Sequence, residues 1–182
     1  MGDQLKTIWT IGHSTRSEEE FISLLKEYRI KTLVDIRHYP GSRRYPHFNK
    51  DQLQHSLETN GMNYIHLVDL GGRRKPLPGS VNNRWRHQAF RGYADYMGTE
   101  AFQSAIQLLQ NEAMKANTAY MCSEAVWWQC HRALVSDYLK IRDWQVLHIM
   151  SAAKTQEHPF TSAARIEEGS LRYDDPELFD EN

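Results

Sequence analysis

The chain has 182 residues, of which 40% are hydrophobic and 11% aromatic, and this size and composition suit a single globular domain. No apolar run approaches the roughly 18–20 residues of a membrane span, and the first six residues lack the basic and apolar regions of a signal peptide. We therefore expect a cytoplasmic protein without a membrane partner. In that reducing compartment, two cysteines serve chemistry or metal binding more often than structural disulfides.

The net charge of −1 conceals an uneven distribution of charged residues. Ten lysines and arginines but only three acids lie between Arg37 and Arg91, a segment that would attract phosphates or nucleic acid. Residues 167–182 contain seven acids and one base, which is typical of a solvated, mobile tail. We therefore predict one domain over residues 1–166 and an acidic tail over residues 167–182. Residues after Glu168 are expected to contribute little to the core.

Strand-like segments alternate with amphipathic helices in the first half of the chain. Ser17, with Glu20 three residues later, matches a capping box, and apolar residues then follow at helical spacing. Asp51 is expected to cap a second, shorter helix. The expected strands in this half are residues 7–11, 32–36 and 64–67.

The second half continues the alternation after a long irregular segment. The segment from Gly71 to Gly98 has no clear period, and loops of that length are usually functional or mobile. Its end, residues 90–97, is expected to begin a helix, and residues 102–109 have a clear helical stripe. The remaining elements are strands at residues 118–121 and 145–149, with a helix over 133–139 between them.

This alternation predicts an α/β fold with one mainly parallel sheet of about five strands and helices on both faces. Ligands in such folds bind beyond the carboxyl ends of the strands. Polar residues follow several of these ends, so one edge of the sheet should collect them. The residues expected there are His13, Ser14, Asp35, Arg37, Cys122, Glu124 and His148.

Residues 121–132 hold both cysteines, an acid, a histidine and an arginine, and they are predicted to form the turn from a strand into a helix. Cys122 ends the strand, where a helix N-terminus and nearby arginines would lower its pKa. Cys130 is predicted to lie one to two turns into the helix, in line with Leu134 in the core. Cys122 is therefore expected to be the more reactive thiol. A small buried cysteine that only packs is the alternative.

The pattern indicates an enzyme, a cysteine-dependent transferase or hydrolase, that acts on a small or nucleotide-like anionic substrate. Cys122 would be the nucleophile, a histidine its acid–base partner, and Glu124 would orient a base or pair with an arginine. Two arginines would hold the anion. The candidate catalytic residues are Cys122, His13, Glu124 and His131. The candidate substrate-binding residues are Arg37, Arg132, Ser14 and Asp35.

Two other functions remain open from the residues alone. The first is a metal site, for which nitrogen and sulfur ligands would suit Zn²⁺ or Fe²⁺. The second is a nucleic-acid-binding module that uses the basic segment between Arg37 and Arg91, where aromatic residues interleave with arginines as in base-stacking surfaces. The candidate metal ligands are His13, Cys122, Glu124, Cys130 and His131.

Several short motifs occur in one order between Thr7 and Ile149, and together they resemble the domain-of-unknown-function family 488. The resemblance implies a bacterial or archaeal, soluble, single-domain α/β protein, and it supplies no reaction. Trp127 and Trp128 occupy a spacer that often contains a proline in that family. The motifs are residues 10–14, 34–37, 45–48, 70–72, 121–124, 130–132 and 148–149. The signature residues would be Gly12, His13, Ser14, Asp35, Arg37, Cys122, Glu124, Cys130, His131 and Arg132.

Overall fold

One six-stranded sheet organises the computed structural model, which describes residues 5–179. Its strands are β1 (Lys6–Gly12), β2 (Thr32–Asp35), β3 (Asn63–His66), β4 (Thr118–Cys122), β5 (Trp144–Ser151) and β6 (Lys154–Glu157). They lie in the order β3-β2-β4-β1-β5-β6. The first five are parallel and β6 runs antiparallel to β5, so the predicted mainly parallel sheet is confirmed. Periodicity did not reveal β6 because all four of its residues are exposed.

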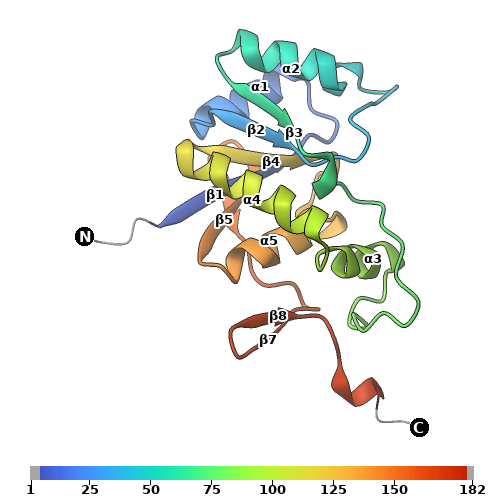
Figure 1. Cartoon of the computed structure of the whole chain (residues 1–182). Helices are drawn as coiled ribbons and strands as arrows, with labels where there is room; N and C mark the ends of the chain where they lie inside the picture. The colour runs from blue at the N-terminus through green and yellow to red at the C-terminus, as the bar shows by residue number, and fades with distance from the viewer. Residues whose placement is uncertain (1–4, 180–182) are drawn as a thin grey trace.

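Helices cover both faces of the sheet, as predicted (Figure 1). The helices are α1 (Glu18–Glu27), α2 (Lys50–Thr59), α3 (Gln88–Tyr96), α4 (Glu100–Lys115) and α5 (Arg132–Lys140). Alternate strand residues face opposite sides. Leu33 packs with α1 and α2, whereas Val34 packs with α3, α4 and α5. Two apolar cores on either side of the sheet therefore hold its strands in place.

Local capping explains where the first two helices begin. The Ser17 side chain accepts a hydrogen bond from the Glu20 N–H at 3.1 Å, which confirms the predicted cap of α1. The second helix starts two residues earlier than expected, because Asn49 and not Asp51 stands at its N-cap. A 3₁₀ turn, η1 (Pro46–Phe48), leads directly into that position. Three further 3₁₀ turns are η2 (Val68–Leu70), η3 (Trp127–Gln129) and η4 (Pro176–Phe179).

The long segment from Gly71 to Gly98 is tied to the domain at several points. It ends in α3, which confirms the helix expected near residue 90. The Tyr93 hydroxyl donates to the Leu70 carbonyl at 2.7 Å, and the Arg74 guanidinium lies 3.6 Å above the Tyr96 ring. Gly92 permits the close approach, since a Cβ there would lie 2.3 Å from the Arg74 carbonyl oxygen.

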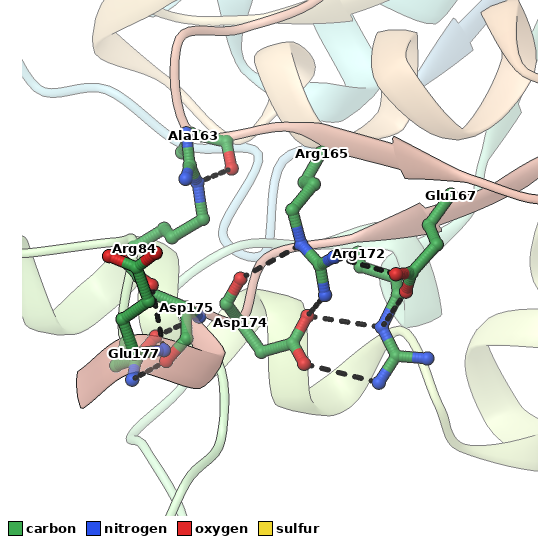
Figure 2. A network of polar contacts seen from close by, with 9 residues as sticks. Arg84, Ala163, Arg165, Glu167, Arg172, Asp174, Asp175 and Glu177 are labelled. Carbon is green, nitrogen blue, oxygen red and sulfur yellow. Dashed lines mark hydrogen bonds and ion pairs between the residues drawn. The ribbon is translucent and has the colours of Figure 1, made fainter. Parts of the chain in front are cut away.

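The chain after β6 forms a small hairpin of β7 (Arg165–Glu167) and β8 (Ser170–Arg172). Figure 2 shows how its charges pair: Arg165 and Arg172 both contact the Asp174 carboxylate. Tyr173 follows the hairpin and is only 4% exposed in the core. The expectation that residues after Glu168 contribute little to the core is therefore wrong for Tyr173. The acidic composition concealed one well-anchored aromatic residue.

Within residues 5–179, no helix combines the length and apolar character needed to span a bilayer. The described residues exclude residues 1–4, which form most of the segment without signal-peptide features. They also exclude residues 180–182 of the predicted 167–182 tail. The predicted division at residue 166 remains a prediction.

Candidate functional site

The carboxyl ends of three central strands meet at one edge of the sheet. Gly12 is in register with Cys122, and Asp35 is in register with Met121. The chain continues the pairing past the end of β1, because the His13 and Ser14 N–H groups donate to the carbonyls of Cys122 and Ser123, each at 3.0 Å. The residues expected to converge after β1, β2 and β4 therefore do so.

His148 does not share that edge. It is in register with Thr10 in the middle of the sheet, and its side chain is completely buried. The expectation that it would line the carboxyl edge is wrong because β5 continues to Ser151, three residues beyond His148.

Cys130 lies beside Cys122 and not in a helix. The 3₁₀ turn η3 folds the chain back after β4, and α5 begins only at Arg132. The two free thiols are buried, and each contacts Arg132. The predicted position of Cys130 inside the helix is therefore wrong, because the apolar pattern around Trp127 belongs to a tight turn that packs against the sheet.

Arg132 is 1% exposed and contacts both sulfur atoms. Its Nε donates to Cys122 Sγ at 3.0 Å, and its backbone N–H donates to Cys130 Sγ at 3.3 Å. Its two Nη atoms donate to the Glu124 carbonyl oxygen at 2.7 Å and to Thr10 Oγ1 at 3.1 Å. Within residues 5–179 no carboxylate forms an ion pair with it. A buried positive charge of this kind requires a negative partner, and the adjacent sulfurs can supply one.

Gly12 makes room for this arginine. A Cβ at position 12 would lie 1.7 Å from the Glu124 carbonyl oxygen and 2.8 Å from Arg132 Nη2. Any side chain here would push the guanidinium away from the thiols, so we conclude that Gly12 is needed for the close approach.

The two thiols differ in acidity, and the order is opposite to the expected one. Burial raises the pKa of the Cys122 thiol well above its usual value, and the neighbouring Cys130 sulfur adds to the effect. Burial also opposes ionisation of Cys130. The neighbouring Cys122 thiol, the Arg132 charge and the Arg132 N–H outweigh it and lower the pKa of Cys130 to about 7. Cys130 is therefore the more acidic thiol of the pair and is partly ionised at neutral pH.

His131 stands at the N-cap of α5 with one ring nitrogen beside Cys130. Its Nε2 lies 2.9 Å from the Ile36 carbonyl oxygen, which can only accept, so Nε2 carries the proton. Its Nδ1 is then a free acceptor 4.0 Å from Cys130 Sγ. Burial lowers the pKa of His131, so the ring stays neutral. Gly72 packs against this ring, because a Cβ there would lie 2.8 Å from Nδ1.

Arg37 and Asp35 form a buried ion pair next to the cysteines. Arg37 donates from Nη2 at 2.7 Å and from Nε at 2.9 Å to the Asp35 carboxylate, which also accepts from the Tyr64 hydroxyl at 2.6 Å. Asp35 is fully buried behind Arg37 and does not line the cleft described below. Asp35 is therefore placed to bind Arg37 and does not face the cleft.

His13 faces Arg37 from the end of β1. Its Nε2 lies 3.4 Å from Arg37 Nη1, its Nδ1 lies 2.9 Å from the Ser14 carbonyl oxygen, and its ring stacks on Phe48 at 4.2 Å. Burial lowers the pKa of His13 to about 4, so the imidazole is neutral at physiological pH. Because Nδ1 donates to a carbonyl, Nε2 is left as an acceptor.

Glu124 does not act as a helix cap or an arginine partner. Its residue is exposed in the loop after β4, and only its backbone carbonyl contacts Arg132. The expected pairing with Arg37 or Arg132 is wrong because each arginine is already bound by other groups. The carboxylate instead lies at the wall of a cleft.

That cleft has a volume of about 870 Å³ and opens above the two cysteines. Three arginines and one glutamate line it, so its charge is positive. Trp128, 49% exposed, and Tyr39, 65% exposed, offer flat apolar faces to it, whereas Trp127 is buried against His148. The site residues found on its walls are His13, Ser14, Arg37, Cys122, Glu124, Cys130 and His131. Arg132 and Asp35 lie beneath it.

A buried hydrogen-bond chain leads from Arg132 through β1 and β5 and back to Asp137, further along α5. Thr10 Oγ1 lies 2.7 Å from His148 Nδ1, and His148 Nε2 lies 2.9 Å from His158 Nδ1. His158 Nε2 lies 2.8 Å from Asp137 Oδ1. Because Asp137 accepts at one end and Arg132 donates at the other, every proton in the chain points toward Asp137. The chain fixes the Arg132 guanidinium beneath the thiols.

Sequence reasoning missed three members of this chain: Thr10, Asp137 and His158. Asp137 carried one usable signal, because it is a charged residue within the apolar helix 133–139. His158 lies in a polar segment, and no pattern distinguishes it from a surface histidine.

The metal and nucleic-acid functions gain no support from this geometry. Among residues 5–179, no three histidine, cysteine or acidic side chains converge to hold a metal ion. Several arginines of the basic segment are bound within the fold. Arg84 donates to the Ala163 carbonyl at 2.8 Å and Arg91 to the Trp85 carbonyl at 2.9 Å.

Fold and site together define an α/β protein with an arginine-bound cysteine pair at the carboxyl edge of a parallel sheet. The sequence model of the family described as "Domain of unknown function DUF488" matches residues 17–139, and the chain belongs to that family. The match includes both cysteines and Arg132 but ends before His148 and begins after His13 and Ser14. No curated protein and no solved structure matches the chain.

Proposed function

We propose that the protein is a cysteine-dependent enzyme, a transferase or hydrolase, that acts on a small anionic substrate of nucleotide-like shape. The observation that carries the proposal is the buried charge of Arg132, which lies against two thiols and has no carboxylate partner among residues 5–179. A cysteine thiolate is the nucleophile and a thiol is not, so a site that stabilises a thiolate is suited to covalent catalysis.

In this proposal Cys130 is the nucleophile, and Cys122 is the neighbouring thiol that shares its contact with Arg132. Arg132 balances the thiolate from beneath and does not contact the substrate. His131 Nδ1 is a neutral acceptor 4.0 Å from Cys130 Sγ and receives a hydrogen bond from this thiol while it is protonated. His13 and Arg37 line the same cleft and would face the substrate there.

The substrate class follows from the walls of the cleft. The excess of arginine over acid favours a phosphate or carboxylate, and exposed rings at Tyr39 and Trp128 favour a flat, aromatic group such as a nucleobase. A cleft of about 870 Å³ has the size of a small-molecule site.

The nucleophile is tested by the rate of iodoacetamide labelling between pH 5 and pH 10, followed by peptide mass mapping. Cys122→Ser and Cys130→Ser separate the two thiols. We expect Cys130 to label first, with an apparent pKa near 7. Labelling that begins only above the free-cysteine value of about 8.5 would contradict the proposal.

The substrate class is tested by protection of Cys130 from iodoacetamide. Nucleoside monophosphates and diphosphates should slow labelling, and inorganic phosphate should do so more weakly. Arg44→Gln should reduce the protection, because Arg44 lines the cleft. Arg43→Gln is the matched control, since this neighbouring exposed arginine is not among the lining residues. Equal protection by neutral nucleosides would exclude an anion requirement.

A further inference from the structure

The second thiol has no obligatory part in covalent catalysis by the first. Arg132 nevertheless contacts both sulfurs, with Nε 3.0 Å from Cys122 Sγ and the backbone N–H 3.3 Å from Cys130 Sγ, so the two sulfurs lie on the same arginine. A thiolate beside a neutral thiol is the arrangement in which oxidation of the first sulfur is resolved by the second.

We propose that Cys122 and Cys130 form a redox site that takes hydroperoxides as its oxidant and closes to an intramolecular disulfide. The inference rests on the proposed function only in assigning the thiolate to Cys130. It does not require a nucleotide-like substrate in the cleft. Both cysteines line the cleft, so a molecule as small as hydrogen peroxide can reach them.

The reaction has two balanced steps. The Cys130 thiolate attacks one peroxide oxygen, so that an S–O bond forms, the O–O bond breaks, and hydroxide leaves and takes a proton from solvent. The sulfur loses two electrons and the peroxide gains them. Cys122 then attacks the sulfenic sulfur, the S–S bond forms and the S–O bond breaks. The departing hydroxide leaves as water with the Cys122 proton.

The surroundings favour this order of events. Arg132 stabilises the attacking thiolate, and Cys122 stays protonated until the second step because burial raises its pKa well above the usual value. The chain from Cys122 to Cys130 is already folded back through η3. The sulfenic acid therefore forms next to the thiol that resolves it, ahead of further oxidation to the irreversible sulfinic acid.

The experiment treats the full chain with hydrogen peroxide at pH 7, with dimedone present to trap sulfenic acid, and measures intact and peptide masses. The wild type should lose about 2 Da, should contain a Cys122–Cys130 disulfide, and should regain its mass with dithiothreitol. Cys122→Ser should instead accumulate a dimedone adduct on Cys130. Cys130→Ser should oxidise at least about tenfold more slowly, since a raised thiol pKa leaves little thiolate.

Three results would overturn the inference. These are a dimedone adduct or sulfinic acid on the wild type in place of the disulfide, equal oxidation rates for the two variants, and a disulfide that joins two chains. The wild-type masses decide the question even if a serine variant fails to fold. Iodoacetamide labelling of the same samples separates the two proposals. A low Cys130 pKa without a disulfide refutes only the redox site, whereas a normal Cys130 pKa refutes the thiolate on which both proposals rest.

Discussion

Two buried arginines, Arg37 and Arg132, lie on opposite faces of the same sheet edge, and their charges are balanced in different ways. Arg37 is bound by the Asp35 carboxylate through several hydrogen bonds and forms a closed ion pair. Arg132 is more deeply buried, yet it meets a hydroxyl, a carbonyl and two sulfurs.

The difference separates a structural charge from a chemical one. A carboxylate beside Arg132 would satisfy its charge permanently and leave both thiols protonated. A pair of thiols satisfies it only when one of them ionises, so the stability of the arginine and the reactivity of the cysteine are coupled. The predictions below test this coupling.

The largest expected effect is on stability at Arg37. Arg37→Leu leaves the Asp35 carboxylate buried without its cation, so the free energy of unfolding should fall by about 3–5 kcal/mol in urea titrations. The exposed Arg43→Leu is the control and should change it by less than about 0.5 kcal/mol. Unchanged stability of Arg37→Leu would show that Tyr64 alone satisfies Asp35, and the contrast between the two arginines would fail.

The next effect concerns pH, through the chain that holds Arg132. Burial, with smaller contributions from the neighbouring His158 and Arg132, lowers the pKa of His148 to about 2. In the unfolded chain this histidine has a pKa near 6.5 and becomes protonated as the pH falls, whereas in the folded protein it stays neutral. The contribution of His148 to the free energy of unfolding is therefore fully present above pH 6.5 and is lost as the pH falls below that value.

His148→Gln removes this titration while keeping a donor and an acceptor. Between pH 6.5 and pH 5 the wild type should lose about 2 kcal/mol more than the variant, measured by urea unfolding at each pH. His13, with a pKa lowered to about 4, contributes equally to both proteins and cancels in the comparison. Parallel pH curves for the two proteins would show that His148 becomes protonated within the fold.

The third effect is on thiol reactivity. Arg132→Met removes the charge that favours the thiolate, so the Cys130 pKa should rise from about 7 toward its ordinary range. Iodoacetamide labelling at pH 7 should then slow about tenfold. In the Arg37→Leu variant, Cys130 should be labelled at the wild-type rate under conditions in which the variant remains folded. Equal slowing by both substitutions would mean that general disorder of the site, and not the charge of Arg132, controls the thiol.

Much of this fold could be predicted from the sequence because its signals are local. Alternating strand and helix patterns gave the parallel sheet, and Ser17 with Glu20 gave a helix start. Polar residues after β1, β2 and β4 gave the position of the site, since parallel strands bring their carboxyl ends together.

The parts that could not be predicted depend on contacts between distant segments. Periodicity does not distinguish a helix from a 3₁₀ turn when Trp127 and Cys130 are both buried, so Cys130 was expected inside the helix and not beside Cys122. Thr10 and His148 are 138 residues apart, and only the β1–β5 register brings them together. Tyr173 lies in an acidic segment, and the acidic composition predicted a solvated tail in spite of this aromatic residue.

The smallest expected effect is at the far end of the Arg132 chain, where the Tyr173 hydroxyl donates to Asp137 Oδ2 at 2.8 Å. Tyr173→Phe keeps the packed ring and removes this hydrogen bond. Asp137 retains His158 and Thr161 as donors. The free energy of unfolding should therefore fall by about 1 kcal/mol, and Cys130 labelling should not change. Tyr173→Ala, which also empties part of the core, should cost about 3–5 kcal/mol. If Tyr173→Phe slowed labelling, the chain would transmit the state of Asp137 to the thiols, and the carboxyl-terminal segment would be part of the site.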